Sequence, residues 1–107
     1  MAAAPMPDGL TLRQQISRTL AGGLYSARDL AHRYAIPERQ VEEHLAHIAR
    51  SVSRDRTCRF IRESAECQLC GFIFRDRARF TRPSRCPDCR SERICAPRFG
   101  IRLISCT

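Results

Sequence analysis

The sequence predicts an α+β protein with helices in its first half and short strands in its second half. Apolar residues recur every three or four positions up to about Ser51, as on one face of a helix, and then alternate with polar residues, as in strands. Two Cys-x2-Cys pairs, Cys67/Cys70 and Cys86/Cys89, lie in the second half. A chain of 107 residues holds one compact domain or two very small modules, which excludes large catalytic architectures.

Two capping signals predict the starts of the first two helices. Thr11 with Gln14 has the form of a capping box, so the first helix begins after Thr11, and it ends before the flexible pair at Gly22. Ser26 with Asp29 repeats the signal at the start of the second helix. The apolar stripes are Leu12, Ile16 and Leu20 in the first helix and Ala27, Leu30, Ala31 and Tyr34 in the second.

A third helix is predicted from Pro37 to about Ser51, because proline suits the first turn of a helix. Its buried stripe is Val41, Leu45 and Ile48, with Ala49 at the edge. Three short helices, the last two joined by a tight turn, are typical of a helix-turn-helix unit whose final helix enters the DNA major groove. A generic helical bundle fits the same periodicity.

Alternation beyond the third helix predicts four short strands. They are Thr57–Arg62, Phe72–Phe74, Arg93–Cys95 and Phe99–Leu103. Strands directly after a helix-turn-helix indicate a wing, a hairpin beside the recognition helix that can contact the DNA backbone. We therefore expect a winged helix-turn-helix of three helices and a β wing.

The two cysteine pairs predict one four-thiolate zinc site made by Cys67, Cys70, Cys86 and Cys89. Four thiolates saturate tetrahedral zinc, so the site is expected to be structural. Redox dithiols and simply buried cysteines are the alternatives. The pairs also resemble rubredoxin knuckles, which bind iron, but Arg90 stands where rubredoxins carry glycine after the second pair.

Three cysteines lie outside these pairs. Cys58 and Cys95 fall in apolar strands and are expected to be small core residues, and Cys106 is expected to be a free thiol near the end of the chain.

The charge of the chain favours a nucleic-acid partner. All 19 basic residues are arginines, against 11 acidic residues, and residues 51–107 carry +7 of the net +8. Arginines bind phosphate in a bidentate fork, and five of them lie between the two cysteine pairs, around Phe80, which is expected either among them or plugging the zinc module. The alternatives are that the loop between the cysteine pairs is solvated without a partner, and that the polar residues on the exposed face of the third helix pair with one another. The predicted nucleic-acid contacts are Arg39, Gln40, Glu43, His47, Arg50, Arg54, Arg56, Arg75, Arg77, Arg79, Arg82 and Arg85.

Residues 10–101 resemble a family of predicted prokaryotic transcriptional regulators, best represented in archaea, that fuse a winged helix-turn-helix to a rubredoxin-like zinc ribbon. The resemblance implies the four cysteine ligands and a ribbon inserted in or after the wing, with pairing of the strands before and after it. The matching stretches are Thr11-Leu-Arg-Gln-Gln-Ile16, Val41-Glu-Glu-His-Leu-Ala-His-Ile48, Ala65-Glu-Cys67, Cys70-Gly-Phe-Ile-Phe74, Pro83-Ser-Arg-Cys-Pro-Asp-Cys89 and Pro97-Arg-Phe99.

The expected organisation is a flexible tail (1–9), a winged helix-turn-helix (10–65), a zinc ribbon (66–95) and a C-terminal strand and tail (96–107). The expected function is that of a cytoplasmic DNA-binding transcriptional regulator with one Zn2+ per chain and double-stranded DNA as partner. A protein-interaction adaptor and an iron electron carrier are the rival functions, and a protein partner and a homodimer stay open. No enzymatic constellation, secretory signal or membrane span is recognised.

Overall fold

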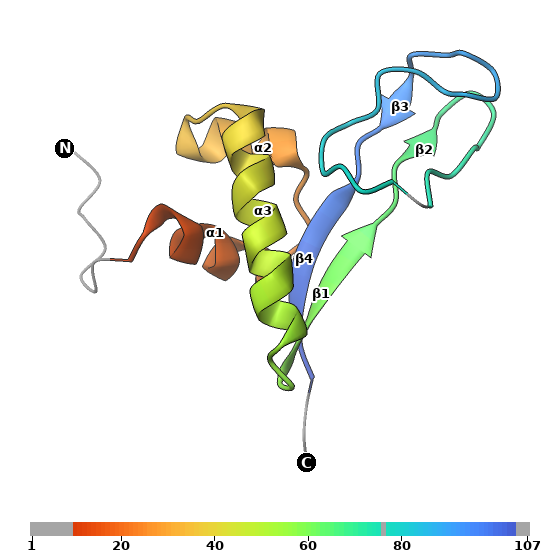
Figure 1. Ribbon diagram of the computed structural model, residues 1–107. Coiled ribbons are helices and arrows are strands. Elements are labelled where there is room, and N and C mark those ends of the chain that lie inside the picture. The colour runs from red at the N-terminus through yellow and green to blue at the C-terminus, as the bar shows by residue number, and fades with distance from the viewer. Residues whose placement is uncertain (1–9, 76, 105–107) are drawn as a thin grey trace.

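A computed structural model describes residues 10–75 and 77–104. The expected tail at 1–9 and Cys106 therefore lie outside the described residues. Three helices precede four strands, and a long irregular segment joins the second strand to the third (Figure 1). The elements are α1 (Leu12–Leu20), α2 (Ala27–Tyr34), α3 (Glu38–Ser53), β1 (Cys58–Glu63), β2 (Glu66–Cys67), β3 (Ile94–Cys95) and β4 (Arg98–Leu103).

The strands form two small antiparallel pairs, β1 with β4 and β2 with β3. The β1–β4 register runs from Cys58 opposite Leu103 to Glu63 opposite Arg98. Residues 64–97, called the ribbon below, are thus inserted at one end of the β1–β4 pair and extend beyond it (Figure 1). This arrangement confirms that the strands before and after the ribbon pair with each other.

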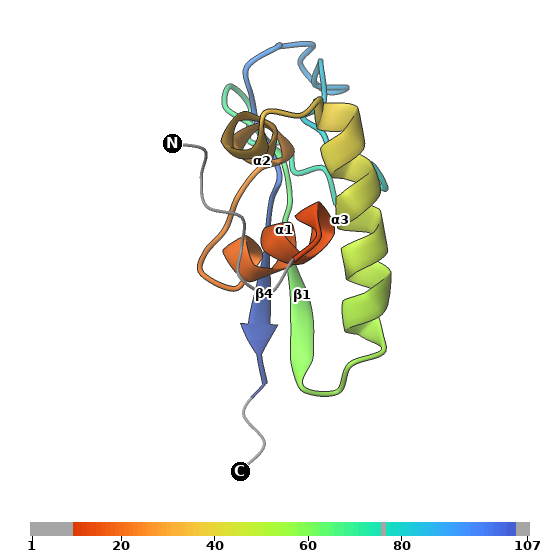
Figure 2. The same cartoon turned by 90° about the vertical axis from the view of Figure 1, so that its left-hand side faces the viewer.

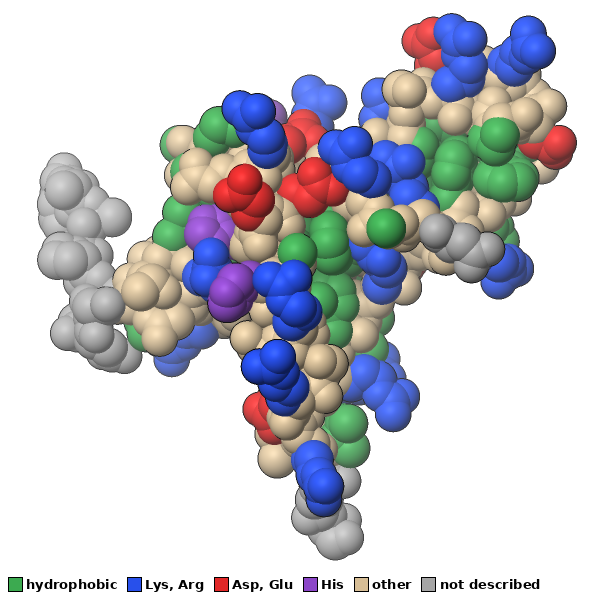
Figure 3. All heavy atoms as spheres, viewed as in Figure 1, with side chains coloured by type: hydrophobic (Ala, Val, Ile, Leu, Met, Phe, Trp, Pro, Cys, Tyr) green, Lys and Arg blue, Asp and Glu red, His purple; other side chains and the backbone are tan. Residues whose placement is uncertain are grey.

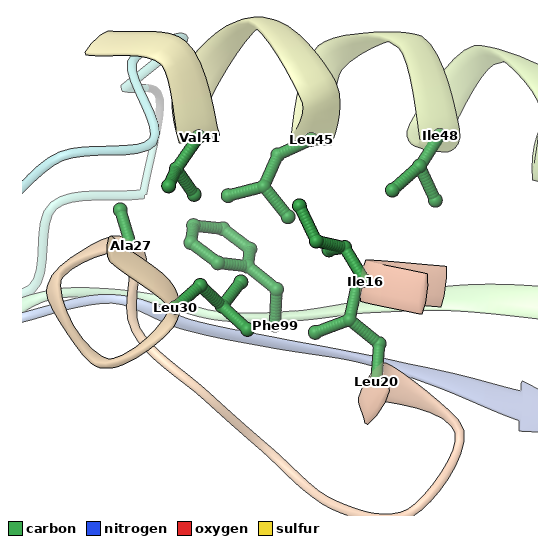
Figure 4. Packing of buried hydrophobic residues seen from close by; sticks show 8 residues of the cluster. All are labelled: Ile16, Leu20, Ala27, Leu30, Val41, Leu45, Ile48 and Phe99. Atoms are coloured by element: carbon green, nitrogen blue, oxygen red, sulfur yellow. The ribbon is translucent and has the colours of Figure 1, made fainter. Parts of the chain in front are cut away.

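The three helices pack on the β1–β4 pair around one apolar core. The turned view shows α3 running along β1 and α1 crossing in front of the strands (Figure 2). Phe99 of β4 lies fully buried at the centre of this core, facing Val41 and Leu45 of α3 (Figure 4). All the core residues below were predicted from the helical stripes except Phe99, which was expected only as the start of a strand. They are Ile16, Leu20, Ala27, Leu30, Val41, Leu45, Ile48 and Phe99.

The helix boundaries follow from local chemistry. Thr11 and Gln14 form the predicted capping box, and Ser26 and Asp29 form the second one. Helix α3 starts after Pro37 without a side-chain cap and continues two residues past the predicted end at Ser51. The sequence pattern thus located all three helices.

The predicted strand at Phe72–Phe74 is wrong. This segment makes only one isolated bridge, Ile73 with Glu66, because Gly71 turns the chain immediately before it and the chain leaves again at Arg75. Its partner β2 was not predicted, since two residues are too short to show alternation.

The expectation that Cys95 is a core residue is also wrong. Its side chain is exposed, and its Sγ accepts a hydrogen bond from Gln68 Nε2 at 3.3 Å. Cys58, which was also expected in the core, is half-buried and belongs to neither of the two apolar clusters.

Candidate metal centre and basic surface

The structure brings the four predicted metal ligands, Cys67, Cys70, Cys86 and Cys89, into one cluster. All four sulfurs lie within 4.8 Å of one another, and both the Cys67–Cys89 and the Cys70–Cys86 sulfur pairs are 3.6 Å apart. Tetrahedral zinc with Zn–S bonds of about 2.3 Å places its sulfurs about 3.8 Å apart. The donor set and its spacing therefore fit a zinc ion, and four thiolates leave no open coordination position.

The two cysteine pairs have the same backbone geometry. In the first, Cys67 N–H donates to Phe72 and Gly71 N–H donates back to Cys67, at 2.8 and 3.0 Å. In the second, Cys86 N–H donates to Ser91 and Arg90 N–H donates to Cys86, at 2.8 and 2.9 Å. The residue after each pair has positive φ, +82° at Gly71 and +65° at Arg90.

Arg90 therefore adopts the left-handed conformation that glycine normally supplies. In the sequence, this departure from the rubredoxin pattern counted against an iron electron carrier. The structure shows that the turn is kept, with an arginine in a strained backbone conformation.

The four neighbouring thiols change one another's ionisation. The backbone N–H of Cys70 lowers the pKa of the Cys67 thiol to about 6. A backbone hydrogen bond from Phe72 favours the Cys70 thiolate, but burial and the three other thiols outweigh it and raise the pKa of Cys70 to about 12. Four thiols this close cannot all ionise by themselves, and a divalent cation removes the repulsion between the thiolates.

A small second core supports the metal cluster. Buried Cys67 and Cys86 pack with Ala65 and Ile94, and the rings of Phe72 and Phe74 meet edge to face at 5.0 Å beside them. Three of the four metal ligands, Cys67, Cys86 and Cys89, thus belong to the apolar interior of the ribbon, whereas Cys70 is exposed.

Residues 71–85, called the inter-knuckle loop, connect the two cysteine pairs and dock on α3. Arg79 donates to the Glu42 carboxylate from Nε at 3.0 Å and from Nη2 at 3.3 Å, and the Phe80 N–H donates to Glu42 Oε2 at 2.9 Å. The Phe80 ring packs on Phe99 and Phe60 of the main core, with centroids 5.2 and 6.4 Å apart. Phe80 therefore packs against the core under the helices and not against the core of the ribbon.

Arg62 of β1 also holds this loop. Its guanidinium donates to the carbonyl groups of residues 77, 78 and 79 at 3.1 to 3.3 Å and lies 4.4 Å from the centre of the Phe80 ring. Sequence reasoning missed Glu42 and Arg62 as loop contacts. The alternation in β1, which places Arg62 on the same face as Phe60, was the one signal that could have indicated Arg62.

The predicted DNA contacts on α3 are all exposed. Arg39, Gln40, Glu43, His47 and Arg50 lie on the helix surface away from the core, and Arg54 and Arg56 continue this stripe into the turn before β1. Blue and purple side chains follow α3 downward in Figure 3, with red ones near its upper end. Within residues 10–75 and 77–104, no arginine of this stripe forms an ion pair.

The loop arginines are less free than the sequence suggested. Arg77 donates to the carbonyl of Thr81, Arg82 donates to the carbonyl of Glu92, and Arg85 lies 3.7 Å from the Glu92 carboxylate. Arg79 binds Glu42, although 65% of its side chain stays exposed. Arg75 is exposed. The loop therefore contributes positive charge beside α3, held largely by internal contacts.

No described helix is both long and apolar enough to cross a membrane.

Comparisons with known proteins match nearly the whole described chain. Residues 11–61 match the family model described as PF0610-like, N-terminal, and residues 64–103 match the PF0610 rubredoxin-like zinc β-ribbon domain. The solution NMR structure of protein PF0610 from Pyrococcus furiosus is similar, with 33% identity, a TM-score of 0.68, and coverage of 84% of this chain and 87% of that one. No curated protein matches. The chain belongs to the PF0610-like family, with an N-terminal PF0610-like domain and a rubredoxin-like zinc ribbon.

Proposed function

We propose that this protein is a cytoplasmic DNA-binding transcriptional regulator, and not an enzyme. In this proposal the helices and the β1–β4 pair act as a winged helix-turn-helix, and the ribbon carries one structural zinc ion. The ribbon replaces the tip of the wing, because it lies between β1 and β4.

The observation that supports this function best is the unpaired arginine stripe of α3. Arg39, Arg50, Arg54 and Arg56 are exposed and form no ion pair within the described part of the chain, while the opposite side of the helix is buried in the core. Such a stripe can bind phosphate oxygens, and Gln40 beside it can donate a hydrogen bond to the edge of a base.

The acidic residues of α3 oppose DNA less than the sequence suggests. Glu42 is turned toward the inter-knuckle loop, where only 19% of its side chain is exposed and Arg79 neutralises its charge. Glu43 is then the one exposed acid of the stripe, and it can accept a hydrogen bond from cytosine.

Fluorescence anisotropy with mixed-sequence duplex DNA at several salt concentrations tests this function. We expect steeply salt-dependent binding, and a shallower slope of log affinity against log salt in Arg50→Ala/Arg54→Ala, by roughly 0.9 for each lost phosphate contact. Arg18→Ala removes an exposed arginine of α1 and is the matched control. Absence of binding at low salt, or an equal effect of the control, contradicts the proposal.

A protein-docking adaptor is the second candidate. It is favoured by exposed apolar side chains on the ribbon, Leu69 at 67% and Ile73 at 38%. Failure to bind any duplex at low salt supports this alternative.

Elemental analysis separates zinc from iron, because both accept tetrahedral thiolate ligation. We expect one zinc per chain and a colourless protein. One iron per chain with a red visible spectrum supports the electron carrier instead.

A further inference from the structure

Among the described side chains of α3, Glu42 makes the hydrogen bonds to the ribbon. Its carboxylate accepts both bonds of a bidentate contact from Arg79 and a third bond from the Phe80 N–H. Burial opposes ionisation of this group, but the Arg79 and Phe80 hydrogen bonds outweigh it and the pKa of Glu42 falls below its ordinary value. Glu42 is therefore charged at neutral pH and held in place.

The inter-knuckle loop has little regular structure of its own to fix its position. From Arg75 to Arg85 its described residues form neither helix nor strand. The segment is held by side chains of two elements: Arg62 of β1 binds the carbonyl groups of residues 77–79, and Glu42 of α3 binds Arg79 and Phe80. Without Glu42, one of these two attachments is missing.

The charge of Glu42 and its contacts predict opposite effects on DNA binding. As a negative charge near phosphates, Glu42 weakens binding, so its removal should strengthen the complex. As the anchor of the loop, it keeps Arg77 and Arg79 beside α3, so its removal should weaken the complex.

Glu38, the first residue of α3, is half-buried and its side chain forms no hydrogen bond or ion pair within the described part of the chain, and it is not among the predicted DNA contacts. Glu42 and Glu38 thus offer a comparison, on one helix, of a carboxylate that holds the loop and one that does not.

We propose that Glu42 is a positioning residue that holds the inter-knuckle loop against α3, so that the loop arginines and the α3 stripe present one continuous surface to DNA. This inference rests on the proposed DNA-binding function. It assigns the α3 carboxylate closest to the ribbon a role in assembling the binding surface.

Three variants of the full-length, metal-loaded protein test the inference. Glu42→Gln removes the charge and the Arg79 pair, Glu42→Asp keeps the charge but shortens the side chain, and Glu38→Gln removes a negative charge of α3 that makes no contact with the loop. Each is measured by the same anisotropy titration, by hydrogen exchange of the Phe80 amide, and by metal content and circular dichroism to verify folding.

We expect Glu38→Gln to bind DNA at least as tightly as the wild type, with a protected Phe80 amide. Glu42→Gln and Glu42→Asp should bind more weakly and exchange Phe80 faster. Their salt slope should be shallower by roughly 0.9 for each loop arginine that loses a phosphate. A charge effect alone predicts tighter binding for Glu42→Gln and no change for Glu42→Asp.

Tighter binding by Glu42→Gln overturns the inference, as does a Phe80 amide that stays protected in both Glu42 variants. Faster exchange with unchanged binding also overturns it, because the loop would then lie outside the DNA surface. If the wild type binds no DNA, the proposed function fails, and the exchange of Phe80 still decides whether Glu42 holds the loop.

Discussion

Replacing Arg90 by glycine should tighten metal binding. Arg90 follows the second cysteine pair with φ of +65°, in the position that Gly71 occupies after the first pair with φ of +82°. A side chain at such φ costs about 1–2 kcal/mol, whereas glycine there loses about 0.5–1 kcal/mol more backbone entropy on folding. The net gain for Arg90→Gly is about 0.5–1 kcal/mol.

Metal binding and folding of the knuckle are coupled, so this gain appears as metal affinity. It corresponds to an affinity about two- to fivefold higher. Competition with a zinc chelator at fixed pH measures it. Removing Arg90 also removes a positive charge near the thiolates, and Arg90→Ala shares that loss while keeping the strained conformation.

The comparison that decides is therefore Arg90→Gly against Arg90→Ala. Equal metal affinities for these two variants would refute the idea that backbone strain is stored at this turn. Gly71→Ala provides the reverse change, because a Cβ there meets no atom within 4 Å and its cost is conformational only. We expect Gly71→Ala to weaken metal binding by about 1 kcal/mol.

Three further predictions concern stability and pH. Gly100→Ala should destabilise the fold by about 1–3 kcal/mol in thermal unfolding, because its Cβ would lie 2.9 Å from the Gly23 carbonyl oxygen; Gly22→Ala, with its nearest atom at 3.5 Å, should cost much less. Metal affinity should fall as pH falls, because protons compete for the thiolates, and a zinc indicator dye follows the release; pH-independent affinity would contradict thiolate ligation. Burial, followed by the charge of Arg13, lowers the pKa of His44 below 6.5. Below pH 6.5 the unfolded state therefore binds more protons than the folded state, and the free energy of unfolding decreases as the pH falls through the folded-state pKa. Urea unfolding above and below pH 6.5 should show a smaller decrease in this free energy for His44→Asn than for the wild type.

Features specified by neighbouring residues could be predicted from the sequence. The capping boxes at Thr11 and Ser26 and the apolar stripes located all three helices, because each signal lies within one or two helical turns. The metal cluster could also be predicted from the sequence, because each Cys-x2-Cys turn is a local structure with its own hydrogen bonds.

Features that depend on distant contacts could not be predicted. A strand was predicted at Arg93–Cys95, where β3 lies, but neither β2 nor the pairing of Glu66 with Cys95, 29 positions later in the chain, was predicted. The density of arginines between the knuckles suggested free phosphate ligands, yet Arg79 binds Glu42, 37 positions earlier in the chain. Only the folded arrangement of ribbon and helix decides which arginines stay unpaired.

The insertion of the ribbon between β1 and β4 has a consequence for how fast this protein folds. Glu63 and Arg98 pair across the sheet although they are 35 positions apart, and Phe99, at the centre of the core, belongs to the last strand. Closing so long a loop is entropically slow, but a ribbon already joined by its metal shortens the loop that remains to be closed. The ion should therefore accelerate completion of a core that contains none of its ligands, and a chain still emerging from the ribosome cannot finish that core until Phe99 has been added.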